Sequence, residues 1–380
     1  MAYSNYDYSN STVELNVNVS NHTEASVGDA GFHLPKWFPL CSFLIDVVIV
    51  GVLILIGFIG NTLSFIVLHK DKNWSTTHFL LQCLSIADTL FLVGCLLLQT
   101  FHSIYPYTKT FEIYNNNIFP RMFKYLWPCG LTVQTARNWI TVTVTVDRYI
   151  AVRFPLRANR VCTVKNMRIV IFFVLCFAIL FNVPRYFETT SVEFLDAETN
   201  ITTVQIRQTS LHVNDVYSTV YGIVLYFIFI AIGPLLMLSV LNINLMIIVR
   251  KSNLERARMA QCRNQQQKTD VNRMLLSVIS VFIICETPAV VYQILLMSKE
   301  PIASAIMPFT NMLVTLNSSV NFFIYCLAGQ KFRKILRNIC CGHRRRRRWE
   351  KLSRNGELEK NPSTTISLMS TTRSHSAKVW

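Results

Sequence analysis

Residues 47–68 form an unbroken run of 22 residues without a single charged side chain. A helix of that length rises further than the roughly 30 Å hydrocarbon layer of a bilayer, so this segment can cross a membrane alone. Only 15% of the residues of the whole chain are charged, far fewer than two soluble domains would need to cover their surfaces. Comparable apolar stretches follow, and we expect six further spans at residues 79–103, 123–147, 169–187, 216–249, 274–298 and 302–328.

The basic residues gather in alternate connecting segments. Segments 69–76, 148–168, 250–273 and 331–348 hold 24 of the 37 lysines and arginines. Basic residues near span ends are retained in the cytoplasm, so the N-terminus is predicted outside and the C-terminus inside. The run of five arginines at 344–348 could mimic a nucleic-acid-binding patch, but seven spans favour contact with anionic lipid, and no nucleic-acid partner is expected.

This topology divides the chain into four parts. Residues 1–40 are expected to form a disordered extracellular tail, residues 41–328 the bundle, residues 329–341 an amphipathic juxtamembrane helix, and residues 342–380 a disordered cytoplasmic tail. The tail lacks the apolar stretch of a signal peptide, so the first span is expected to carry it across. Glycosylation sequons that agree with this topology lie at Asn10, Asn18, Asn21 and Asn200.

Two cysteines follow the juxtamembrane helix, whose apolar and basic side chains fall on opposite faces. Such a helix lies in the membrane interface, and palmitoylation of Cys340 and Cys341 would anchor it there; the alternative is that both remain plain thiols. The serines and threonines of the final tail could, when phosphorylated, bind the basic surface of a partner protein, or they could form a solvated spacer.

Five short patterns, each in a different span, together resemble the rhodopsin-like G-protein-coupled receptors. They are Gly60-Asn61, Leu84-Ser85-Ile86-Ala87-Asp88, Asp147-Arg148-Tyr149, Pro234 and Asn321-Phe322-Phe323-Ile324-Tyr325. Within that family the chain is most similar to invertebrate receptors for FMRFamide-like peptides and myosuppressins. That narrower likeness rests on Ile104-Tyr105-Pro106-Tyr107-Thr108, Asn182-Val183-Pro184-Arg185 and the segment 317–322.

The resemblance implies an all-α membrane protein, a seven-transmembrane helix bundle with a short amphipathic eighth helix, at the plasma membrane. It implies signalling to a heterotrimeric G protein, with the inhibitory class favoured, by outward movement of the sixth helix. The activation residues it implies are Asp88, Arg137, Asp147, Arg148, Tyr149, Pro234, Phe282, Pro288, Asn321 and Tyr325. Arg148, Pro155 and Leu156 would contact the G protein, and Asp147 would hold Arg148 at rest.

The chain also departs from the family pattern at several places. Glu286 stands where most members have a tryptophan, and Phe322 where most have a proline. The cysteine expected near Phe123 is missing, and segment 188–215 has none to pair with it, so we expect no disulfide there. Alternating residues on both sides of Asn200 instead predict a short hairpin.

The inner faces of the outer span ends predict a polar and aromatic ligand site. We expect ligand contacts from Gln99, His102, Trp127, Gly130, Gln134, Tyr221, Glu286, Tyr292, Gln293, Phe309, Asn311 and Thr315. The resemblance places Gly130 where monoamine receptors carry an aspartate, which argues against an amine. An amidated Arg-Phe peptide is cationic and would be attracted by the acids of the outer loops. Glu286 is expected either to receive its arginine or to be a protonated carboxyl that bonds a neighbouring span.

Arg137 lies deep in the third span, where a charge needs a partner. Asp88 is an acid at matching depth, so the sequence predicts an Asp88–Arg137 ion pair in place of the sodium ion that many related receptors bind, with Asn317 and Ser318 as neighbours. The alternative is that Arg137 bonds backbone carbonyls.

Other function classes fit less well. A transporter should show an internal repeat, and a channel should show a ring of charges or carbonyl-forming glycines; neither pattern is present. No nucleophile–base constellation or metal-ligand spacing occurs, so we expect no enzyme, cofactor or metal site. A receptor for another peptide or for a small ligand remains an alternative, and the sequence does not fix the G-protein subtype or the oligomeric state.

Overall fold

A computed structural model describes residues 38–71, 75–195, 202–259, 266–298, 302–330 and 332–339. The chain divides into two compact units after Gly329, and each is described by itself. The predicted glycosylation sites Asn10, Asn18, Asn21 and Asn200, the cysteines Cys340 and Cys341, and the cytoplasmic tail lie outside the described residues.

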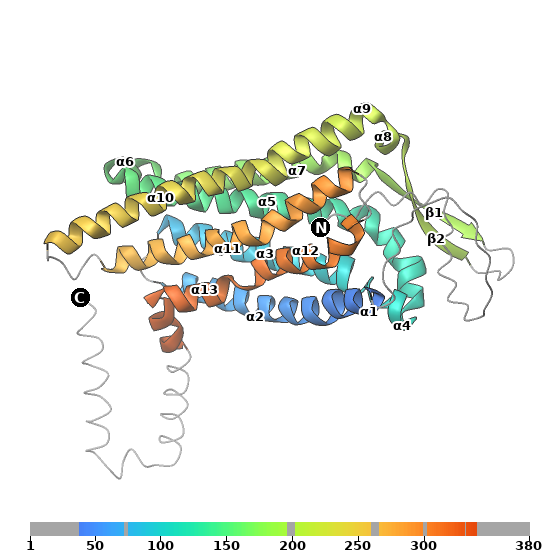
Figure 1. Cartoon of the computed structure of the whole chain (residues 1–380), viewed down its shortest axis with the longest axis horizontal. Helices are drawn as coiled ribbons and strands as arrows, with labels where there is room; N and C mark the ends of the chain where they lie inside the picture. Colours follow the sequence, from blue (N-terminus) through green and yellow to red (C-terminus); the bar gives the residue numbers. More distant parts are fainter. Residues whose placement is uncertain are drawn as a thin grey trace, which may run out of the picture. The chain divides into compact units, whose positions relative to one another are not determined.

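The first unit is a bundle of long helices that lie side by side, shown in Figure 1. Its first half begins with α1 (Phe38–Phe43), a π-helical stretch (Leu44–Ile49), α2 (Val50–His69) and α3 (Thr76–Cys95). It continues with a second π-helical stretch (Leu96–Thr100), α4 (Tyr105–Thr108), a third π-helical stretch (Tyr114–Ile118), α5 (Phe119–Arg153) and α6 (Pro155–Val161). Its second half comprises α7 (Val164–Asn182), a 3-10 turn (Val183–Phe187), α8 (Ser210–Val213), α9 (Asp215–Tyr217), π-helical stretches (Ser218–Leu225 and Phe227–Ala231), α10 (Ile232–Met259), α11 (Gln266–Met297), α12 (Ile302–Ser319) and α13 (Asn321–Ala328).

Five helical segments within the described residues are long and apolar enough to cross a membrane. They are Leu40–His69, Thr76–Thr108, Val164–Phe187, Asp215–Ile248 and Ser277–Leu295. The remaining two predicted spans are α5 and the pair α12 and α13, which carry buried polar side chains such as Arg137, Asn138 and Asn317. Polar side chains lower the mean hydropathy of these two helices, and the bundle interior surrounds them because lipid would not solvate them.

Side chains on the outside of the bundle are apolar. Leu55 on α2 and Phe172 on α7 are 64% and 61% exposed, as expected for surfaces that contact lipid rather than water. The interior is closely packed: a Cβ on Gly60 would lie 2.9 Å from the Cβ of Phe322. Gly60 therefore lets α2 approach α13 closely, which is how small residues serve helix packing in membranes.

The segment after α7 forms the predicted hairpin. Strands β1 (Thr189–Leu195) and β2 (Thr202–Gln208) pair antiparallel, with Thr189 opposite Gln208 and Leu195 opposite Thr202. Polar contacts hold the hairpin to α5: Ser191 donates to the Pro120 carbonyl at 3.0 Å, and Arg121 forms an ion pair with Glu193 at 2.7 Å. Ile206 packs against Phe119 and Phe123.

The cysteines of the described residues are all free thiols, including Cys41 and Cys129. Cys129, which lies on α5, instead contacts the Tyr186 hydroxyl at 3.0 Å. Within the described residues, the predicted strand pairing and the side-chain contacts to α5 hold the loop.

Three long helices contain breaks in regular hydrogen bonding. Pro288 lies inside α11, where it has no N–H to donate to the carbonyl of Ile284. The seventh span is interrupted at Val320, between α12 and α13. The fifth span is π-helical until Ala231, and a Cβ on Gly233 would collide with the carbonyl oxygen of Ile228, so glycine is required just before Pro234.

The second unit contains a helix over residues 332–339. Phe332 is buried, whereas Lys334 and Arg337 are exposed. This pattern agrees with the amphipathic helix expected over residues 329–341.

Candidate functional site

A cavity opens between α5, the π-helical part of the fifth span, α11 and α12. Five of the predicted ligand contacts line it: Gln134, Glu286, Tyr292, Gln293 and Asn311. The remaining lining residues were not predicted as ligand contacts, and they are Asn138, Tyr226, Ile230, Ala231, Pro234, Leu235, Phe282, Ala289, Val290 and Thr310. A sequence alone does not distinguish such inward-facing residues from core packing.

The other predicted contacts lie outside this cavity. His102 stacks on Phe119 with ring centroids 4.0 Å apart, and Trp127 stacks on Phe123 at 5.7 Å. The Tyr221 hydroxyl donates to the Phe181 carbonyl at 2.5 Å. Gln99 and Thr315 are buried, a Cβ on Gly130 would meet Leu98, and half of the Phe309 surface is exposed. Their role in ligand binding stays a prediction.

Gln99 bonds Asp46, a buried acid that was not among the predicted site residues. Its amide donates to the Asp46 carboxylate at 2.8 Å, and Ser42 donates to the same carboxylate at 3.2 Å. Asp46 is buried in the first span. An acid immediately before an uncharged run of 22 residues was the signal that could have identified it.

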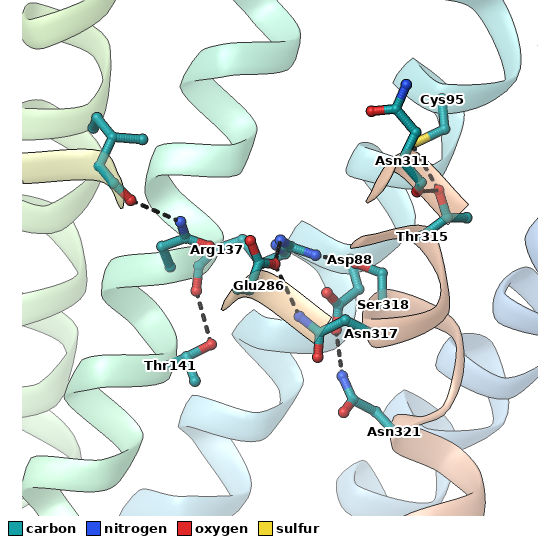
Figure 2. A network of polar contacts seen from close by, with 12 residues as sticks. Asp88, Cys95, Arg137, Thr141, Glu286, Asn311, Thr315, Asn317, Ser318 and Asn321 are labelled. Carbon is teal, nitrogen blue, oxygen red and sulfur yellow. Dashed lines mark hydrogen bonds and ion pairs between the residues drawn. The ribbon is translucent and has the colours of Figure 1, made fainter. Parts of the chain in front are cut away.

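A buried polar network adjoins the cavity through Glu286, and Figure 2 shows this network from close by. Arg137 on α5 donates from Nη2 to the Oε1 of Glu286 on α11, at 2.5 Å. Its Nη1 donates to the Ser318 hydroxyl on α12, also at 2.5 Å. Asn317 donates to the same Glu286 oxygen at 3.2 Å. The guanidinium also lies over the Phe91 ring of α3, 4.4 Å from its centroid, so four helices meet at Arg137.

The predicted Asp88–Arg137 ion pair is wrong, because the partner of Arg137 is Glu286. Asp88 instead accepts a hydrogen bond from Asn321 at 2.7 Å, and it lies within electrostatic range of Arg137. Two acids stand at similar depth, and the direction in which the guanidinium points decides between them. Ser318 and Asn317 are neighbours of Arg137 and Glu286, as expected.

This geometry also bears on the two hypotheses for Glu286. The side chain lines the cavity, but one of its oxygens already accepts from Arg137 and Asn317. A ligand cation would therefore share this carboxylate with Arg137, and both hypotheses for Glu286 stay predictions.

The opposite end of α5 carries the predicted resting contact. Arg148 donates from Nη2 to the Asp147 carboxylate at 2.8 Å, and Thr76 on α3 donates to the same carboxylate at 3.4 Å. The contact is a single hydrogen bond rather than a bidentate pair, since the Nε of Arg148 has no partner.

The remaining predicted switch and coupling residues lie as follows. Tyr325 is buried, and the Tyr149 ring meets Phe154 edge-on with centroids 6.5 Å apart. Phe282 packs in an apolar cluster with Val142 and Leu238. Pro155 begins α6, in which Leu156 is 86% exposed and available to a partner.

An acidic side chain at the hairpin end is the centre of a second polar cluster. Glu188 contacts Arg185 at 3.1 Å, the Tyr217 hydroxyl at 2.8 Å and the His212 ring at 3.8 Å. Burial raises the pKa of Glu188, but hydrogen bonds from His212 and Tyr217 and the charge of Arg185 outweigh burial and leave that pKa below its usual value of 4.5. Glu188 is therefore an ionised acceptor that ties the hairpin base to α8 and α9.

Membrane-crossing helices packed around a buried polar network define a helical membrane protein. Residues 60–325 match the 7 transmembrane receptor (rhodopsin family) pattern. The chain belongs to this family, whose members are receptors rather than enzymes.

Curated relatives agree with that assignment. The chain is 34% identical to the FMRFamide receptor of Drosophila melanogaster over 298 residues, which are 78% of this chain and 53% of that receptor. It thus spans about half the length of that relative. It is 27% identical to the sex peptide receptor of Drosophila melanogaster (76% of this chain, 71% of the relative) and 28% identical to the FMRFamide peptide receptor frpr-18 of Caenorhabditis elegans (76% and 68%).

Proposed function

We propose that this chain is a plasma-membrane receptor for an amidated FMRFamide-like neuropeptide and that it activates a heterotrimeric G protein. The observation that carries the proposal is the similarity to the Drosophila FMRFamide receptor, supported by the FMRFamide peptide receptor of Caenorhabditis elegans. The cavity suits such a ligand because amide, tyrosine and carboxylate side chains line it.

The outer segments carry exposed charges of both signs. Glu112 and Asp215 are exposed there, as are Lys109 and Arg207, while Glu193 is paired with Arg121. We propose that the acids attract a cationic ligand and raise its association rate. Asp196 and Glu198, which the sequence places in the same region, lie outside the described residues.

The signal would leave through the α6 end of the bundle. Outward movement of α11 about Pro288 would open this end and expose Arg148, after the contact with Asp147 breaks. Leu156, exposed on α6, is the apolar side chain we assign to the G-protein contact. We propose inhibitory coupling and arrestin binding to the phosphorylated tail, with the N-terminus outside the cell.

A screen of amidated neuropeptides tests the proposal on cells that report several G-protein classes. Peptides ending in Arg-Phe-amide should produce a signal, and the same peptides with a free C-terminal acid should be much weaker. A response to unrelated ligands alone, or a substrate flux or conductance without G-protein activation, would contradict it.

Glu286 provides a sharper test of the ligand's cationic end. Glu286→Gln should weaken peptides that carry arginine more than analogues that carry citrulline at the same place, because citrulline is neutral. Equal losses for both peptides would show that Glu286 does not sense the ligand's charge.

A further inference from the structure

Arg137 contacts residues beside two of the breaks of the bundle, those at Pro288 and Val320. On one side it pairs with Glu286, which lies two residues before Pro288. On the other it bonds Ser318, two residues before the interruption at Val320 between α12 and α13. Both breaks are places where helices bend, because a regular backbone hydrogen bond is missing or distorted.

Glu286 belongs to the turn of α11 that Pro288 weakens. The hydrogen bond missing at Pro288 would have joined residues 284 and 288, which bracket Glu286. The hydroxyl of Thr287 also donates to the carbonyl of Ile283 at 2.6 Å, one residue before the Ile284 carbonyl that loses its helical donor at Pro288. A change of bend at this turn therefore moves Glu286 relative to α5.

The second break is supported in the same manner. Asn61 on α2 donates to the backbone carbonyl of Ser318 at 3.0 Å, while the Ser318 hydroxyl accepts from Arg137. Ser318 is fully buried. A change of bend between α12 and α13 would thus alter the contact of Ser318 with Arg137.

We propose that Arg137 is a positioning residue that acts as a lock: its contacts hold α11 at Pro288 and the α12–α13 junction at Val320 in their resting bends. When its contact with Glu286 breaks, α11 becomes free to move to its signalling position. The cavity that receives the ligand includes Glu286, so a ligand donor in the cavity competes with Arg137 for this carboxylate. This competition would be the way in which the ligand activates the receptor, and it rests on the proposed function. The lock itself is a property of the unliganded chain.

The geometry explains why such a lock has two stable settings. The side chains of Arg137 and Glu286 are 1% and 9% exposed, so water does not replace a broken contact cheaply. Asp88 lies within electrostatic range and provides Arg137 with a second acid when Glu286 moves away. A guanidinium between two carboxylates can exchange one for the other without becoming unpaired.

The test uses the full-length receptor without ligand. Basal G-protein signalling, normalised to surface expression, is compared for wild type, Glu286→Gln, Arg137→Met and Ser318→Ala. Both ion-pair variants should raise basal signalling at least about fivefold, the lower end of usual coupling between two conformations. Ser318→Ala removes the side-chain contacts of Ser318 with Arg137 and Asp88 but keeps the ion pair, so its increase should be smaller. Asp46→Asn is the matched control, because it removes a buried span carboxylate outside the network and should leave basal signalling unchanged.

Hydrogen exchange on the purified receptor provides a second readout that needs neither ligand nor G protein. Arg137→Met should speed exchange at both residues 282–288 and residues 316–324, although residue 137 lies on a different helix from either. Ser318→Ala, which folds most easily of the three, should speed exchange at 316–324. Asp46→Asn should change neither segment.

The outcomes separate the lock from the ligand assignment. Unchanged basal signalling together with unchanged exchange at both segments, in variants expressed at the surface, overturns the lock. Faster exchange at both segments in a receptor that responds to no peptide supports the lock and contradicts the proposed function instead.

Discussion

The ion pair between Arg137 and Glu286 should show strong non-additivity in stability. Arg137→Met removes the only cation of the cluster that the structure describes and leaves the carboxylates of Glu286 and Asp88 without it. Breaking a buried pair from one side costs about 3–5 kcal/mol, and the low exposure of both side chains means that no solvent screening reduces this figure. Glu286→Gln should cost less, about 1–3 kcal/mol, because glutamine still accepts a hydrogen bond and Asp88 remains in range.

The double variant Arg137→Met/Glu286→Gln should cost less than the sum of the two single variants, since it leaves no unpaired partner of the pair. The expected coupling is about 0.5–3 kcal/mol. Thermal unfolding in detergent can be followed with a thiol-reactive dye, because Cys95 and Cys285 are buried until the bundle opens. Asp46→Asn combined with either single variant is the control and should be additive. Additive losses in the Arg137/Glu286 double variant would refute the assignment of this pair.

Three further predictions concern ions, reduction and pH. Agonist affinity should not change when sodium is exchanged for a bulky organic cation, because the Arg137 guanidinium occupies the buried polar network. Arg137→Ser should create sodium sensitivity, and a sodium response in the wild type would contradict this. Mild reduction should leave peptide binding intact because Cys41 and Cys129 are free thiols, and a marked loss would indicate an unrecognised bridge. The Glu188 contacts depend on its ionised form, so they should be kept at any pH above 4.5 and lost as the pH falls through the lowered pKa. Peptide dissociation should therefore be constant from pH 7 to 5 in the wild type, and a change within that range would contradict this assignment.

The sequence by itself indicated the helical bundle and the hairpin, and its prediction of which ends of the spans face the cytoplasm stays a prediction. Hydropathy and the placement of lysine and arginine depend on how each segment meets lipid and water, and each can be read without knowing its neighbours. The strands β1 and β2 followed from alternation on either side of Asn200, and the missing cysteine predicted a loop without a disulfide. The five predicted cavity residues were found because polar side chains in apolar spans must face inward.

Only the tertiary structure decided which acid pairs with Arg137. Helical periodicity gives depth and face within one span, but it does not give the rotation of one span against another, and Asp88 and Glu286 were equivalent in depth. The packing of α5, α11 and α12 turns the guanidinium toward Glu286 and Ser318 and leaves Asp88 to Asn321. For the same reason the sequence placed His102, Trp127 and Tyr221 among the ligand contacts, while the structure packs their rings against neighbouring aromatic side chains, because an inward face can meet either a cavity or another helix.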